Sequence, residues 1–93
     1  MELIRYHIVF RGHVQHCGFR YFTWKKVKKV GNLTGWVRNK ADGSVEMEVQ
    51  GREEDIKDVL VLIKKGNGTI RVDEVQVEEI NVIPEEKLYQ VLR

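Results

Sequence analysis

The sequence predicts an α+β domain in which two helices cover one face of a sheet. Strand-like stretches lie at residues 3–11, 44–50 and 70–83. Two stretches with helical periodicity lie between them, at 19–30 and 53–65. The chain has 93 residues, 42% of them hydrophobic and 32% charged. This composition is typical of one small globular domain, so we expect residues 1–93 to share a single core.

The first half of the chain predicts a strand, a helix and a second strand. Residues 3–11 alternate, and one side of this strand is formed by Ile4, Tyr6, Ile8 and Phe10. A loop with two glycines follows at 12–18. From residue 19 the period becomes helical, with one stripe of Phe19, Phe22, Thr23, Val27 and Val30. Gly31 is a favourable stop for this helix, and residues 33–40 return to extended character.

The second half predicts a hairpin, a helix and one or two further strands. Asp42-Gly43 favours a tight turn before residues 44–50. There Val45, Met47 and Val49 face inward, and Ser44, Glu46, Glu48 and Gln50 face outward. The helix at 53–65 has an inner face of Ile56, Val59, Leu60 and Ile63, and its acidic start and basic end suit the helix dipole. Residues 70–83 predict a long strand with a bulge near Asp73-Glu74, and residues 88–92 a short edge strand.

The resulting order is β-α-β-β-α-β, with the edge strand as a fifth. It predicts a ferredoxin-like sandwich: an antiparallel four- to five-stranded sheet with two helices on one face. Two helices with one apolar stripe each cover only one face, so we expect the other face to contact water. The same fold serves enzymes, RNA binders and regulatory modules, so the function has to be argued from particular residues.

Composition excludes several functional classes. Sixteen Lys and Arg against fourteen Asp and Glu give a net charge of +2, too weak to indicate nucleic acid or an anionic membrane as the main partner. An RNA-recognition strand would need exposed aromatics where residues 44–49 carry glutamates. One cysteine and three scattered histidines make neither a disulfide nor a zinc site, so we expect no metal or other cofactor. With no signal peptide and no membrane span, we expect a cytoplasmic monomer.

Two stretches carry candidate chemistry. Residues 15–20 join a strand to the start of a helix, where backbone N–H groups lack intrahelical partners and can bind an anion. Arg20 adds a planar fork for two phosphate or carboxylate oxygens. Asn39, before the Asp42-Gly43 turn, offers an amide that can hold a water molecule. Taken singly, each feature also fits a structural role, the first as a glycine loop with a surface arginine and the second as a turn cap.

Together the two stretches resemble the acylphosphatase family. The signature loop of that family, Gly-x-Val-Gln-Gly-Val-x-Phe-Arg, is similar to Gly12-His13-Val14-Gln15-His16-Cys17-Gly18-Phe19-Arg20. Its second signature is similar to Gly35-Trp36-Val37-Arg38-Asn39, followed by Asp42-Gly43-Ser44-Val45-Glu46. Spacing and element order match over nearly the whole chain and weaken after about residue 66.

The resemblance implies hydrolysis of acyl phosphates to a carboxylate and inorganic phosphate, the latter as product and inhibitor. It implies that no metal and no covalent intermediate are needed. It assigns phosphate binding to Arg20 and the backbone amides of Gln15, His16, Cys17, Gly18, Phe19 and Arg20, and it assigns the attacking water to Asn39.

Two residues depart from the family pattern. His16 stands where the family has Gly, and Cys17 where it has Val. If residue 16 needs a positive φ, His strains the loop, although His tolerates this region better than bulky residues do. Three readings of His16 stay open: lower activity, harmless accommodation, or help in binding phosphate when protonated. A catalytically impaired anion-binding or regulatory domain of the same family is therefore the alternative function. Cys17 is expected to be a small apolar replacement, with a reactive thiol as the alternative.

Overall fold

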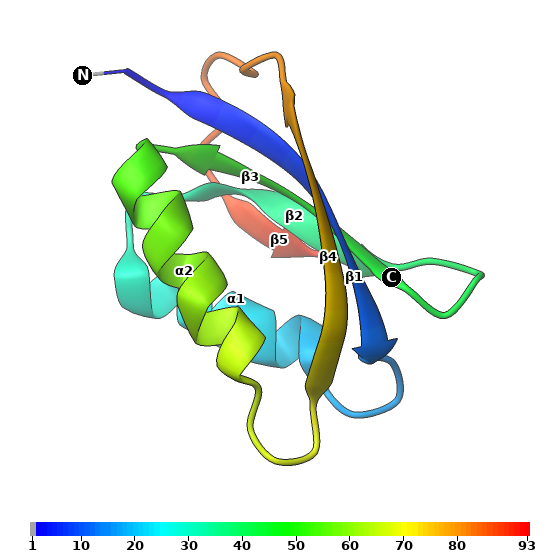
Figure 1. The fold of residues 1–93 in the computed structure, drawn as a ribbon. Helices are drawn as coiled ribbons and strands as arrows, with labels where there is room; N and C mark the ends of the chain where they lie inside the picture. The colour runs from blue at the N-terminus through cyan, green and yellow to red at the C-terminus, as the bar shows by residue number, and fades with distance from the viewer. Residues whose placement is uncertain (1) are drawn as a thin grey trace.

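Five strands and two helices alternate in the predicted order. The computed structural model describes residues 2–93 (Figure 1). The elements are β1 (Ile4–His13), α1 (Phe19–Val30), β2 (Thr34–Asn39), β3 (Val45–Gly51), α2 (Glu53–Lys65), β4 (Arg71–Ile80) and β5 (Tyr89–Val91). The edge strand predicted at 88–92 is confirmed as β5, and α2 has the predicted bounds.

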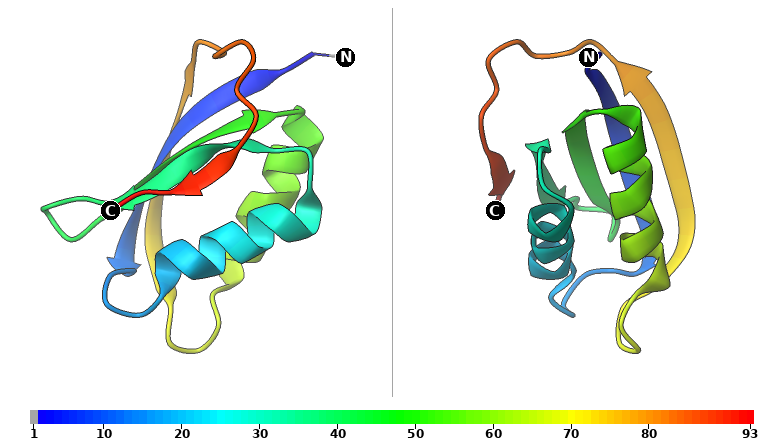
Figure 2. Two further views of the ribbon diagram at one scale, coloured as in Figure 1. Left: turned by 180° about the vertical axis from the view of Figure 1, so that it is seen from behind. Right: turned by 90° about the vertical axis from the view of Figure 1, so that its left-hand side faces the viewer.

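The sheet has the strand order β4-β1-β3-β2-β5. Its first four strands pair antiparallel, whereas β5 pairs parallel to β2, so the sheet is mixed rather than wholly antiparallel. Both helices lie on one face of the sheet (Figure 2). Between the layers lies a core of apolar side chains that includes Ile8, Phe10, Val37, Met47 and Val49 from the sheet and Phe19, Val27, Ile56, Val59 and Ile63 from the helices.

β4 contains the predicted bulge and ends earlier than predicted. Arg11 pairs with Glu74 and Gly12 with Val72, which leaves Asp73 as the extra residue. The strand ends at Ile80 instead of residue 83. The backbone amide of Ile83 donates to Gln50 Oε1 at 2.8 Å, and Gln50 Nε2 donates to the Ile83 carbonyl at 2.9 Å. These bonds hold the chain after β4 against β3 and direct it toward β5.

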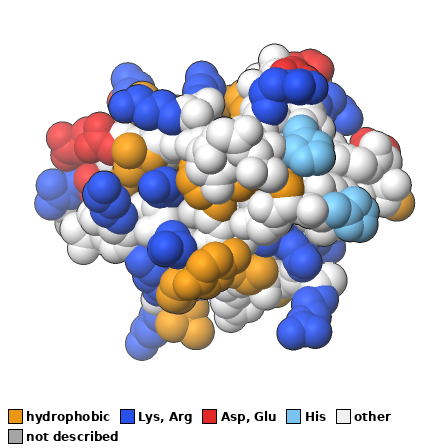
Figure 3. All heavy atoms as spheres, turned by 90° about the horizontal axis from the view of Figure 1, so that it is seen from below, with side chains coloured by type: hydrophobic (Ala, Val, Ile, Leu, Met, Phe, Trp, Pro, Cys, Tyr) orange, Lys and Arg blue, Asp and Glu red, His pale blue; other side chains and the backbone are white. Residues whose placement is uncertain are grey.

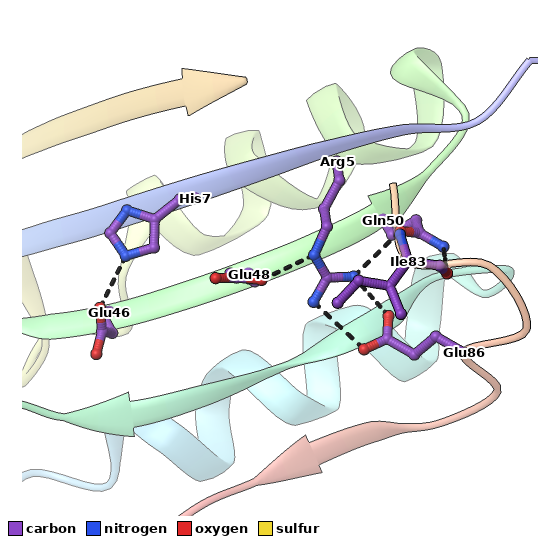
Figure 4. A network of polar contacts seen from close by, with 7 residues as sticks. All are labelled: Arg5, His7, Glu46, Glu48, Gln50, Ile83 and Glu86. Carbon is purple, nitrogen blue, oxygen red and sulfur yellow. Dashed lines mark hydrogen bonds and ion pairs between the residues drawn. The ribbon is translucent and has the colours of Figure 1, made fainter. Parts of the chain in front are cut away.

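The sheet face opposite the helices is not the water-covered surface that the alternation predicted. Arg5 is fully buried there, and only 4% of Gln50 is exposed. The Arg5 guanidinium donates to Glu48 at 2.8 Å, to Gln50 at 3.1 Å and to Glu86 at 2.7 Å (Figure 4). The segment between β4 and β5 brings Glu86 across this face. Because a buried cation needs charged or polar partners, these bonds fasten that segment to the sheet.

The Glu46 side chain lies on the same face, is only 7% exposed and has two polar partners. Its carboxylate lies 2.7 Å from His7 Nε2 and accepts a bond of 2.6 Å from Arg38 Nε. Burial alone would raise the pKa of Glu46, but the bonds with His7 and Arg38 outweigh it and hold this pKa below its usual value. His7 and Glu46 are thus part of the sheet's own bonding.

Candidate active site

A cleft with a volume of about 790 Å³ lies where the β1–α1 loop, the end of β2 and the residues after β5 meet. Its lining residues are Val14, His16, Gly18, Phe19, Arg20, Tyr21, Asn39, Val91 and Arg93. Figure 3 views the face that carries the β1–α1 loop. Lys and Arg side chains are spread over most of this face, and acidic side chains lie at its margins. Such a surface attracts an anion.

The loop enters α1 through two residues with left-handed backbone conformation. His16 has φ 60°, and Gly18, the residue before the helix, has φ 79° and ψ 19°. Glycine adopts this conformation without penalty, whereas an L side chain such as that of His16 costs roughly 1–2 kcal/mol. The sequence predicted strain at His16 only if this residue had a positive φ, and the structure confirms the positive φ.

The N-terminus of α1 has no side-chain cap and no acidic residue in its first turn. The N–H groups that begin a helix have no intrahelical acceptor and carry its positive dipole end. α2 differs, because Glu53, Glu54 and Asp55 occupy its first turn. The start of α1 is thus the helix end suited to an external anion, and it opens into the cleft.

Gln15 ties the loop to the β2–β3 turn. Its Nε2 donates to the carbonyl oxygens of Lys40 at 2.7 Å and Ser44 at 2.8 Å. Asn39 is the last residue of β2, directly before Lys40. The turn is also braced by Asp42, whose Oδ1 accepts bonds from the hydroxyl and the amide of Ser44. These two bonds lower the pKa of Asp42 to about 2.

Arg20 is fixed from the opposite side by the end of the chain. Its Nη1 donates to the Leu92 carbonyl at 2.7 Å. The Leu92 amide in turn donates to the Val37 carbonyl at 2.8 Å, beside the parallel pairing of β5 with β2. A guanidinium has five N–H donors, and this bond uses one of them.

The comparisons with known proteins give one family. The family model described as Acylphosphatase matches residues 6–91. The chain belongs to the acylphosphatase family. This confirms the resemblance seen in the two motifs.

Curated relatives and solved structures match most of this chain and most of their own length. The acylphosphatase of Geobacillus thermodenitrificans is 40% identical over 88 residues, which cover 95% of this chain and 93% of the relative. The acylphosphatase of Bacillus licheniformis is 46% identical over 77 residues, covering 83% and 84%. The crystal structure of acylphosphatase from Bacillus subtilis superposes with a TM-score of 0.89 at 30% identity, covering 97% of this chain and 99% of that one. The ferredoxin-like fold is thus the fold of this enzyme family.

Most of the residues that the acylphosphatase motifs single out lie at the cleft. His16, Gly18, Phe19, Arg20 and Asn39 line it. Gln15 and Cys17 are not among the lining residues, so the structure does not bring these two motif residues to the cleft. The Gln15 side chain is directed to the turn, and Cys17 Sγ lies 3.5 Å from the His13 carbonyl, against the core.

The acylphosphatase motifs did not include three further lining residues: Tyr21, Val91 and Arg93. Val14 belongs to the first motif, but no role was assigned to it. Val91 and Arg93 reach the cleft through the parallel pairing of β5, which no local pattern indicates. Tyr21 gave a signal, because an aromatic residue beside Arg20 falls off the buried stripe of α1. Among residues 2–93, no group of three His, Cys, Asp or Glu side chains is placed to hold a metal ion. Neither helix in this part of the chain is long and apolar enough to cross a membrane.

Proposed function

We propose that this protein hydrolyses the carboxyl–phosphate bond of acyl phosphates, with Arg20 and the loop amides binding phosphate and Asn39 orienting water. One observation carries the proposal: Arg20 and Asn39, from different elements, line the same cleft at the uncapped start of α1. Family membership supports the same reaction.

Phosphate binding is assigned to the backbone amides of residues 15–20 and to Arg20. The helix start supplies N–H donors and a positive dipole end without a competing carboxylate. The Arg20 guanidinium is planar and positively charged, and its bond to the Leu92 carbonyl limits its motion. Donors fixed before the substrate arrives stabilise a developing charge without reorganisation, and each contributes roughly 10²–10³ in rate.

Asn39 is assigned to the attacking water. Its side-chain carbonyl accepts a hydrogen bond from water, whose oxygen attacks phosphorus as the bond from phosphorus to the acyl oxygen breaks. The carboxylate leaves with the bonding electrons, and the proton of the water passes to a phosphate oxygen. A carboxylate is a good leaving group, so positioning and charge stabilisation suffice. No metal, cofactor or covalent enzyme intermediate takes part in this scheme.

A catalytically impaired anion-binding domain is the second candidate, favoured by the φ of 60° at His16. Strain at that position would turn the loop amides away from their best directions. This candidate binds phosphate but turns over no substrate.

We further propose that residues 1–93 act as one domain, as a monomer in the cytoplasm, without a nucleic-acid or membrane partner. The weak net charge supports the absence of a nucleic-acid or membrane partner, and the single cysteine fits the reducing cytoplasm. Light scattering of the purified protein tests the oligomeric state.

The decisive assay measures release of inorganic phosphate from acetyl phosphate in EDTA. We expect turnover by the wild type and competitive inhibition by phosphate. Arg20→Lys is expected to lose both phosphate affinity and about 10²-fold or more in rate, since a point charge does not replace the fork. Arg71→Lys is the control, because Arg71 is exposed and bonds Asp73 outside the cleft.

Asn39→Ala separates water positioning from anion binding. We expect kcat to fall at least about 10²-fold while inhibition by phosphate is retained. Asn81→Ala, at an exposed position after β4, is the control. A wild type that binds phosphate without turnover would favour the second candidate. Phosphate affinity lost with kcat unchanged in Asn39→Ala would contradict the role of Asn39.

A further inference from the structure

An exposed aromatic side chain stands at the edge of the cleft, next to the candidate phosphate-binding arginine. Tyr21 is 60% exposed and lines the cleft together with Arg20. Both residues belong to the first turn of α1. An aromatic residue with this exposure is not held by the core, so most of its surface is available to a ligand in the cleft.

The Tyr21 ring is supported from within the helix. It stacks on the Trp24 ring, with centroids 5.7 Å apart and planes 17° from parallel. Lys28 Nζ lies 5.6 Å from the Trp24 centroid, and Lys25 Nζ lies 5.6 Å from the Tyr21 centroid. Stacking and cation–π contacts of this kind restrict the rings, so an exposed aromatic surface with lysine ammonium groups beside it is in place before any ligand arrives.

This aromatic surface lies where the acyl group of a bound acyl phosphate would extend from the phosphate site. When phosphate lies at the start of α1, an acyl group that extends along the cleft wall meets Tyr21. Tyr21 and the half-exposed Val91 contribute apolar surface to that wall. No acidic residue among the described residues lines the cleft.

We infer that Tyr21, backed by Trp24, is the binding surface for the acyl group, and that the preferred substrates are acyl phosphates with an aromatic or extended apolar acyl group. This inference rests on the proposed function and names its substrate class. A planar acyl group stacks on the Tyr21 ring, whereas the methyl group of acetyl phosphate is too small to cover it. Tyr21 therefore determines specificity and is not needed for the chemistry of the phosphate group.

The test compares benzoyl phosphate with acetyl phosphate in wild type, Tyr21→Ala and Tyr21→Phe. Because the ring contacts the acyl group before and during the reaction, its loss should raise KM and leave kcat nearly unchanged. For Tyr21→Ala we expect kcat/KM to fall about tenfold with benzoyl phosphate and less than about twofold with acetyl phosphate. Tyr21→Phe keeps the ring and should behave as wild type. Val61→Ala, at an exposed apolar position of α2 outside the cleft, is the control.

The outcomes separate this inference from the function on which it rests. An equal loss with both substrates in Tyr21→Ala, or no loss with either, overturns the acyl-binding surface and leaves acyl phosphate hydrolysis standing. A wild type that turns over neither substrate overturns both. A selective loss with benzoyl phosphate, restored in Tyr21→Phe, supports the inference, since a merely structural role would not distinguish the substrates.

Discussion

The bonds from Gln15 to the β2–β3 turn allow a quantitative test of how the cleft is assembled. Gln15→Ala removes two hydrogen bonds, to the carbonyls of Lys40 and Ser44. Neither carbonyl is left without a donor, because Gly43 N–H still bonds Lys40 and Lys40 N–H still bonds Ser44. The loss is therefore that of the bonds alone, about 1 kcal/mol each and about 2 kcal/mol together. For a domain of this size, that loss lowers Tm by roughly 8–16 °C.

Activity should fall further than the change in stability explains. Gln15 holds the loop, which carries the candidate phosphate site, against the residue that follows Asn39. Gln15→Ala removes the side-chain bonds that hold the loop to the turn, so we expect the Asn39 amide, proposed to orient water, to be less well aligned with the loop amides. A displacement of about 1 Å costs on the order of 10² in rate. We expect kcat/KM for acetyl phosphate to fall about 10- to 100-fold at a temperature where the variant is fully folded.

Thermal unfolding by circular dichroism and phosphate release give the two readouts. Gln76→Ala is the matched control, because Gln76 is exposed on β4 and its side-chain oxygen accepts only a long bond of 3.5 Å from Arg11 within residues 2–93. It should change stability by less than about 0.5 kcal/mol and leave activity unchanged. A Gln15→Ala protein with the Tm and activity of wild type would refute the reasoning.

Four further predictions concern stability. Arg5→Met should lower the unfolding free energy measured in urea by about 2–3 kcal/mol, because it leaves Glu48 and Glu86 without their cation. The loss is at the lower side of the range for buried ion pairs, since the two carboxylates are partly exposed. The pKa of Asp42 is lowered to about 2, so its contribution is complete above the ordinary carboxyl pKa and is lost as the pH falls through 2; Asp42→Asn should flatten that part of the pH–stability curve. Tyr89→Phe should stabilise by about 1 kcal/mol in the same urea assay, because the buried hydroxyl has no hydrogen-bond partner among the described residues. Phosphate at about 100 times its Kd for the wild type should raise the unfolding free energy by about 2.7 kcal/mol. At the same phosphate concentration Arg20→Lys should gain less, because its Kd is higher.

Local patterns predicted the elements well because each element carries its own periodicity. α2 matches its predicted bounds, since its apolar stripe, acidic start and basic end agree. The buried face around Arg5 could not be predicted in this way. Its partners Glu48 and Glu86 are 43 and 81 residues away in the sequence, and alternation alone cannot tell a solvated carboxylate from one that pairs with a buried cation.

The candidate site also contains residues that local patterns predicted and residues that they did not. His16, Arg20 and Asn39 line one cleft because Arg20 and Asn39 lie at the ends of regular elements and His16 lies in the loop between two of them. The contribution of Val91 depends on a three-residue strand pairing parallel with β2, which is a property of the assembled sheet.

The two helices differ in the charge of their first turns. This difference stabilises α2 but leaves the N-terminus of α1 open to an external anion. α2 places three carboxylates in its first turn, so its dipole is offset within the chain. α1 begins after a left-handed Gly18, with a strained His16 two residues earlier and no acidic residue in its first turn, and neither helix has a side-chain cap. The backbone strain at His16 and the N–H groups without intrahelical acceptors at the start of α1 destabilise the isolated protein, and both lie at the cleft. A bound phosphate would supply the acceptors and the negative charge that α1 lacks, so binding energy and local stability at this helix end have the same origin.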